Sequence, residues 1–167
     1  GLEKHEYEKL MKLWELQGEQ LVQQQVHEQE SWAMLQSPEK EKLIKIVEEM
    51  VHAAHASRYH WGIVGTEKNK ARGEWQIARV YAALERFVSS AHHAQLYMDA
   101  CVEHSFDYWD LPFAYEGLAR ALVANDPVQA EKHLTEAKQL GEKIEKTEDK
   151  EWLHTNLDEI TAMINAT

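Results

Sequence analysis

The three prolines of the chain each stand where a helix is expected to begin. Proline is tolerated in the first helical turn, because the amide hydrogen that it lacks would have no partner there. Ser37-Pro38-Glu39 combines a capping hydroxyl, the proline and an acidic residue. Asp110-Leu111-Pro112 and Asn125-Asp126-Pro127 are similar signals. Because no stretch alternates β-branched with polar residues, the sequence predicts an all-α fold.

Helical spacing of apolar residues between these signals predicts about seven helices. They cover residues 3–35 (with Gly18 as the weak point), 37–61, 69–85, 88–104, 110–124, 127–145 and 147–164. The later loops are only a few residues long, so successive helices are expected to form antiparallel hairpins. A chain of this length fits one domain. Residues 1–167 are therefore predicted to form a single helical-repeat domain, with a long N-terminal helical segment over 1–36 and stacked hairpins over 37–167.

Two segments of the chain can be laid over one another, GEWQIARVYAALERFVSSAHHA and PFAYEGLARALVANDPVQAEKH. Trp75 then matches Ala114, and Ala82 matches Ala121. Small residues at such spacings let the two helices of a hairpin approach closely. Each hairpin would have an apolar face that only a neighbouring hairpin can bury, which is typical of a solenoid.

The segment AYEGLARALVANDPVQAEKHLTEA resembles a tetratricopeptide repeat. The residues that carry the resemblance are Trp75, Gly117, Leu118, the turn at 125–127, Ala130, Leu134 and Ala137. The resemblance covers about residues 70–145, although the repeat offset exceeds the family's usual ~34 residues. It implies a right-handed superhelix of hairpins and a non-enzymatic scaffold that binds a protein or peptide. The stretch from HAAHASRYHW to GEWQIARVY also resembles a group of bacterial proteins, and that resemblance implies no activity.

Charge and cysteine content narrow the classes of partner. The net charge is -11, with 18 basic against 29 acidic residues, which disfavours nucleic acid and anionic membranes. No apolar run is long enough to span a membrane.

The single cysteine, Cys101, cannot form an internal disulfide and is expected to be a core thiol. A cytoplasmic location is therefore predicted. No nucleophile elbow, P-loop or dinucleotide-binding fingerprint occurs, so neither enzymatic activity nor a cofactor is predicted.

Arg58 lies within the apolar stripe of its helix on a helical wheel. A charge in such a stripe is costly unless it is paired. Glu74 falls on the inward face of the next helix, so the sequence predicts an Arg58–Glu74 ion pair with a largely buried Arg58. The alternative is that Arg58, close to the helix C-terminus, reaches solvent and caps carbonyl groups.

The stretch HAAHASRYHW contains three histidines and is the strongest candidate for a metal site. Metal binding needs imidazoles that converge, but His52, His55 and His60 diverge on the wheel. We therefore expect them to bind no metal, with His52 exposed and the other two at helix borders. The alternative function is a metal- or small-ligand-binding protein that uses these three histidines with Glu49 or Glu151.

Basic and polar residues on the first helices of the predicted hairpins are the candidates for ligand binding. They are Arg72, Gln76, Arg79, Tyr115 and Arg120. Basic positions on an acidic surface favour a partner with an acidic segment or a terminal carboxylate. The leading prediction is therefore a module that binds a protein or peptide, and self-association through the first helix is a further alternative.

Overall fold

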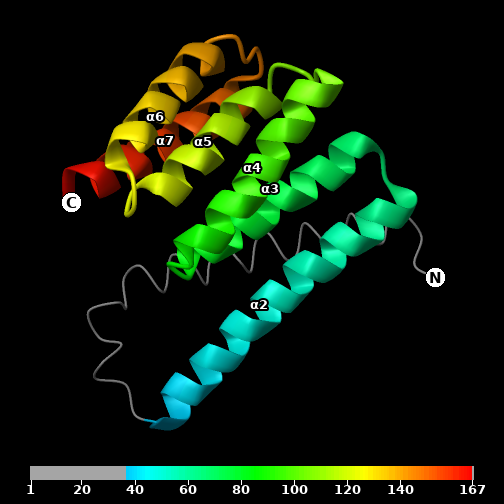
Figure 1. Cartoon of the computed structure of the whole chain (residues 1–167), viewed down its shortest axis with the longest axis vertical. Helices are drawn as coiled ribbons and strands as arrows, with labels where there is room; N and C mark the ends of the chain where they lie inside the picture. The colour runs from blue at the N-terminus through cyan, green and yellow to red at the C-terminus, as the bar shows by residue number, and fades with distance from the viewer. Residues whose placement is uncertain (1–36, 167) are drawn as a thin grey trace.

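The computed structural model describes residues 37–166, which form six α-helices (Figure 1). The helices are α2 (Ser37–Val64), α3 (Glu67–Ala83), α4 (Phe87–His104), α5 (Asp110–Leu122), α6 (Pro127–Gly141) and α7 (Thr147–Ala166). No strand occurs in this part of the chain, so the all-α prediction is confirmed for it. The helix expected over residues 3–35 lies outside the described residues, and the total of seven stays a prediction. None of the described helices is long and apolar enough to cross a membrane.

The observed helix ends agree with the expected ends within a few residues, with two informative differences. Helix α2 continues through Gly62 to Val64, because one glycine costs an interior helical position only about 1 kcal/mol. The position where the packing requires a glycine is Gly65, because a Cβ atom there would lie 2.6 Å from the Trp61 carbonyl oxygen. Helix α6 ends at Gly141, before the expected residue 145, and the chain then turns to bury Ile144.

Side-chain caps explain two of the helix starts. Thr66 and Asn69 form a capping box at the start of α3, in which each side chain accepts a hydrogen bond from the other residue's backbone amide. Asp126 accepts a hydrogen bond from the Gln129 amide, and Pro127 is the first residue of α6. The turn predicted at residues 125–127 is thus confirmed as a helix start.

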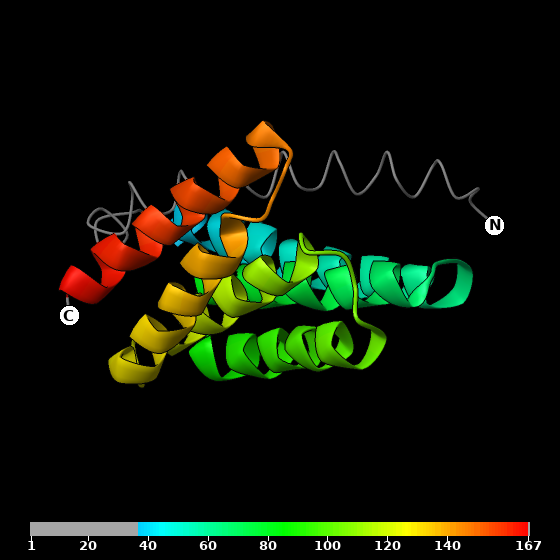
Figure 2. The same ribbon diagram turned by 90° about the horizontal axis from the view of Figure 1, so that it is seen from above.

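Helix α5 is the centre of the arrangement. Each helix contacts the next one in the chain, and in addition α5 contacts both α3 and α7. Helices α3, α5 and α7 therefore form a row in which α5 contacts both of the others. Helices α4 and α6 are the second helices of the hairpins. Helix α2 lies along one edge of the array, away from α6 and α7 (Figures 1 and 2).

The buried apolar side chains form two separate clusters. The large cluster joins α3 to α7 and includes Trp75, Tyr97 and Phe113, the last two fully buried. The small cluster joins α2 to α3 and consists of Met50, Ala54, Ile77 and Val80. Trp61 is a further buried apolar side chain of α2, so burial of apolar area, the main stabilising term, holds α2 at this residue and at the small cluster.

We predict opposite effects for alanine at two buried helical glycines. A Cβ atom at Gly73 would lie 2.7 Å from Cδ and 3.3 Å from Cα of Arg58, so α2 would have to move. A Cβ atom at Gly117 would meet Ala94 and Trp75 at 3.7 and 3.8 Å, which is ordinary contact. Gly73→Ala should destabilise the protein by about 1–2 kcal/mol, whereas Gly117→Ala should stabilise it by about 0.5–1 kcal/mol.

Thermal and urea unfolding of the two variants measures both changes. Equal stabilisation by the two substitutions would contradict the close packing of α2 on α3 at Gly73.

Candidate functional site

A buried carboxylate, Asp110, joins α3, α4 and α5. Arg72 donates to it twice, from Nε to Oδ1 at 2.8 Å and from Nη2 to Oδ2 at 3.0 Å. The Tyr97 hydroxyl also donates to Oδ1, at 2.7 Å. Burial raises the pKa of Tyr97 well above its usual value, and the charge of Asp110 adds to this. Burial lowers the pKa of Arg72, but the hydrogen bonds and charge of Asp110 outweigh it, so that pKa is raised. The three donors compensate the burial of this carboxylate.

The outer side of this centre is a surface that we call the Arg72 surface, formed by Lys68, Arg72, Phe106, Asp107 and Trp109. The Arg72 guanidinium lies over the Trp109 ring, 4.5 Å from its centroid. Lys68, one helical turn earlier, lies 5.9 Å from the Phe106 centroid and pairs with the exposed Asp107 at 2.5 Å. The Arg72 side chain is 38% exposed. Both cations are thus held against aromatic rings and remain accessible to solvent.

A second buried carboxylate, Glu116, connects α3, α5 and α7. Its Oε1 accepts a hydrogen bond from Arg120 Nε at 2.7 Å and lies 3.7 Å from Arg79 Nη1. Arg79 also donates to the Asn156 side chain, and Arg120 to the Asn156 carbonyl and to Glu159. Burial lowers the pKa of Arg120, but the charges of Glu116 and Glu159 outweigh it, so that pKa is raised. The network ties the three alternate helices together.

The five residues proposed from sequence for ligand binding do not share one accessible surface. Gln76 is only 4% exposed, and the Arg120 side chain is 13% exposed within the Glu116 network. Tyr115 is half-buried and its ring packs beside that of His133 on α6. Arg79 is held between Glu116 and Asn156. Burial by neighbouring helices makes Gln76 and Arg120 interior residues, which corrects their expected place in an open groove. Arg72 is the most accessible of the three arginines.

The ion pair predicted between Arg58 and Glu74 is present. Arg58 Nε donates to Glu74 Oε1 at 2.6 Å, and His93 Nδ1 lies 2.7 Å from the other oxygen, Oε2. The Glu74 side chain is 13% exposed, as expected for an inward residue, but Arg58 is 31% exposed. The prediction that Arg58 is largely buried is therefore wrong. Its stem packs on Gly73 of α3, while its guanidinium reaches a groove between helices.

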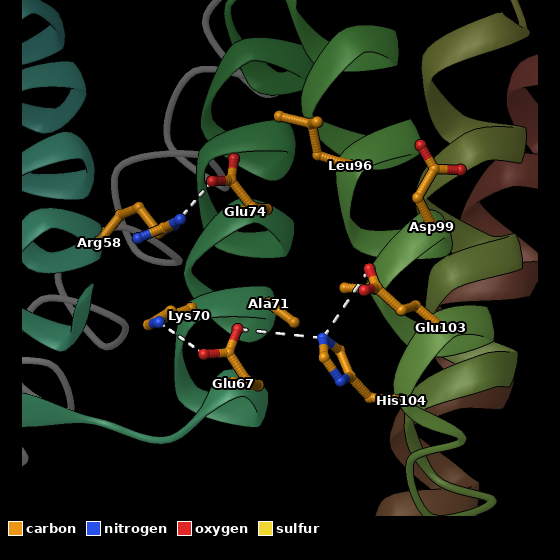
Figure 3. A pocket seen from close by; sticks show the side chains of 10 residues that line it. Arg58, Glu67, Lys70, Ala71, Glu74, Leu96, Asp99, Glu103 and His104 are labelled. Carbon is orange, nitrogen blue, oxygen red and sulfur yellow. Dashed lines mark hydrogen bonds and ion pairs between the residues drawn. The ribbon is translucent and has the colours of Figure 1, made fainter.

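That groove has a volume of about 360 Å³ and lies between α2, α3 and α4 (Figure 3). Charged side chains line it from both walls: Arg58, Glu67, Lys70, Glu74, Asp99, Glu103 and His104, with Ala71, Leu96 and Ala100 between them. Lys70 donates to Glu67 at 2.6 Å, and His104 Nε2 lies 3.9 Å from both Glu67 and Glu103. The lysine and arginine of the groove are thus already matched with carboxylates of α3.

The three histidines of HAAHASRYHW diverge, as the wheel predicts. His52 is exposed, and His60 is half-buried with its ring against Tyr59. His55 Nε2 lies 3.0 Å from the Tyr81 hydroxyl of α3, which places it at a helix border as expected. Within residues 37–166, no three His, Cys, Asp or Glu side chains are placed so that they could hold a metal ion. Trp61 of the same stretch is buried.

Cys101 is a core thiol, as the sequence predicts. It is 5% exposed and packs in the large apolar cluster with Ala94 and Met98. Burial raises the pKa of the thiol to about 12, and the nearby Asp110 charge adds to this. Because the thiolate is the nucleophile, a thiol with this pKa is inert at neutral pH.

Three important residues were missed from the sequence: Asp110, Glu116 and His93. Asp110 was assigned only a role at a helix start, and Glu116 none. The signal for both is the mostly apolar composition of α5, whose charged residues are only Asp110, Glu116 and Arg120. Any carboxylate in such a helix must be buried and paired. His93 carried no comparable signal, because its partner Glu74 comes from another helix.

No protein-family model, curated protein or solved structure matches the chain. The functional inference therefore depends on the polar centres at Asp110, Glu116 and Glu74 and on the surfaces beside them.

We predict that Asp110→Ala destabilises the protein by about 3–5 kcal/mol, because it leaves Arg72 and Tyr97 without their buried acceptor. The matched control is Asp107→Ala, which removes a carboxylate that also pairs with a base of α3 but is 69% exposed. That change should cost no more than about 1 kcal/mol. Denaturant unfolding of both variants measures the difference, and similar costs would contradict the structural role of Asp110.

We also predict that Cys101 does not react with a thiol reagent in the native protein at pH 8. Its buried thiol has a pKa of about 12, so almost no thiolate is present. One equivalent should react after unfolding in guanidinium chloride. Rapid reaction of the native protein would show that the α4–α5 packing opens readily.

Proposed function

We propose that this chain is a tetratricopeptide-like array of helix hairpins that binds a protein or peptide with an acidic segment. The order of helix contacts supports the array: α3, α5 and α7 meet in sequence, as the first helices of successive hairpins would in such a repeat. The Glu116 network then cross-links these first helices. Helix α7 would follow α5 as the next first helix, and α2 would cover the α3–α4 hairpin.

The observation that carries the binding proposal is the Arg72 surface. Arg72 uses Nε and Nη2 for Asp110, and no hydrogen bond to Nη1 is present among the described residues. The guanidinium is also fixed in place by Trp109. Arginine and tryptophan are the residues most enriched at the energetic centres of protein interfaces. A guanidinium that is already fixed in place can bind a carboxylate with little loss of side-chain entropy.

Lys68 adds a second positive charge to the Arg72 surface, which favours an acidic ligand. It lies one turn from Arg72 on α3, and its only ion-pair partner among the described residues is the exposed Asp107. Asp107 also lies close enough to Arg72 to affect its pKa. A ligand carboxylate can therefore replace Asp107 at low cost, because that pair is exposed to solvent.

Fluorescence anisotropy with labelled peptides tests the proposal. The probes are a glutamate-rich peptide and a lysine-rich peptide of equal length. The acidic peptide should bind, with an affinity that falls as salt is added, because exposed charges are screened. Lys68→Glu should weaken binding several-fold, whereas Asp107→Asn should strengthen it by releasing Lys68 and removing a repulsive charge.

The matched control is Lys132→Glu, which makes the same change of charge at an exposed position of α6. It should leave the affinity nearly unchanged. Absence of binding by the acidic peptide, or an equal loss in the Lys68 and Lys132 variants, would contradict the proposed site.

A further inference from the structure

Helix α2 is attached to the array by a small apolar cluster and by a group of polar side chains. The polar group, which we call the α2 junction, consists of His55 and Arg58 of α2, Glu74 and Tyr81 of α3, and His93 of α4. Glu74 is bonded to Arg58 and His93, and Tyr81 to His55. The His93 ring stacks on Tyr81 with centroids 5.6 Å apart, and its distance from the His55 ring is 5.4 Å.

We propose that the α2 junction is a proton-sensitive latch, in which protonation of both His55 and His93 loosens α2 from α3 and α4. The inference concerns a conformational property and does not depend on the binding proposal. The junction has a single carboxylate, Glu74, which can compensate only a limited number of positive charges.

A first positive charge added to the junction, on His93, would be well compensated. His93 Nδ1 lies 2.7 Å from Glu74 Oε2, so an imidazolium at His93 would form an ion pair. Its ring also stacks on the face of Tyr81, which favours a cation. Glu74 would then be shared by two cations, because Arg58 holds its other oxygen.

The second proton has no counter-charge left. His55 faces Tyr81, whose hydroxyl is neutral, and it touches the ring of His93. A charged His55 would therefore be repelled by a charged His93. Burial lowers the pKa of His55, and the charge of His93 lowers it further, while Glu74 opposes this.

Other ionisable groups around the junction do not remove this repulsion. His52 on α2 lowers the pKa of His55, and the His92 ring of α4 lies 5.1 Å from that of His93. The remaining groups lie in the groove next to Arg58: Glu67, Lys70, Asp99, Glu103 and His104. Of the carboxylates there, Glu67 is held by Lys70, and Asp99 accepts a hydrogen bond from Gln95.

The direction of the pH effect follows from the lowered pKa. A histidine with a lower pKa in the folded than in the unfolded state stabilises the fold fully above its unfolded value of about 6.5. The stabilisation is lost as the pH falls through the lowered folded value. The small cluster of Met50, Ala54, Ile77 and Val80 and the buried Trp61 would then be the main attachments of α2.

Hydrogen exchange of the purified chain at pH 7.5 and pH 5.5 tests the latch, with rates corrected for the intrinsic effect of pH. Amides of α2 from Met50 to Trp61 should lose protection several-fold at pH 5.5 relative to those of α5. His55→Phe, which keeps a ring but cannot take a proton, should abolish this relative loss. His133→Phe is the matched control, because burial also lowers the pKa of His133, which lies on α6.

An NMR titration gives a second readout that does not need α2 to open. In His93→Gln, whose amide can still donate to Glu74, the titration midpoint of His55 should rise relative to the unsubstituted chain. An unchanged midpoint would refute the coupling of the two imidazoles. Equal protection of α2 at both pH values, or the same pH response in His55→Phe as in the unsubstituted chain, would refute the latch.

Discussion

The packing of the described chain depends on two carboxylates that are fully buried in its central helix. Asp110 and Glu116 of α5 are both 0% exposed. A buried charge must be neutralised, and the cations come mostly from other elements: Arg72 and Arg79 are on α3, while Arg120 is on α5 itself. These pairs fit only when α3 lies directly beside α5. They therefore specify which helices are neighbours, while the apolar cluster supplies most of the stabilising free energy.

Helix α2 is attached differently. Among the described side chains, no fully buried carboxylate links it to α3, and its ion pair uses Arg58, which is 31% exposed. Its apolar contacts form a cluster of their own. Opening α2 would consequently leave the Asp110 and Glu116 centres intact. A chain with two kinds of attachment can have one labile helix on a stable remainder, since local opening follows the number of buried apolar contacts.

The sequence was sufficient to predict features that depend on a single helix or on two consecutive helices. Pro112 and Pro127 lie in the first turns of α5 and α6, as expected, because helix-start signals are local. The Arg58–Glu74 pair followed from the wheels of two consecutive helices. Burial of Gln76 and of Arg120 could not be found in this way, because it depends on α5 packing against both α3 and α7. A wheel shows which residues share a face, but the number of helices covering that face is a property of the whole fold.

The two tasks of Arg72 are compatible for a geometric reason. Its guanidinium holds Asp110 through Nε and Nη2, on the edge that faces the interior. The planar fork of arginine presents five N–H donors, so further donors remain for a ligand without loss of the bonds to Asp110. Lysine at this position could not do both, because its single ammonium has no fixed plane. With a ligand carboxylate bound there, the single positive charge of Arg72 would face two negative charges, that of the ligand and that of Asp110. Lys68 beside it would supply the second positive charge. The proposed preference for an acidic ligand would therefore depend on the two bases together.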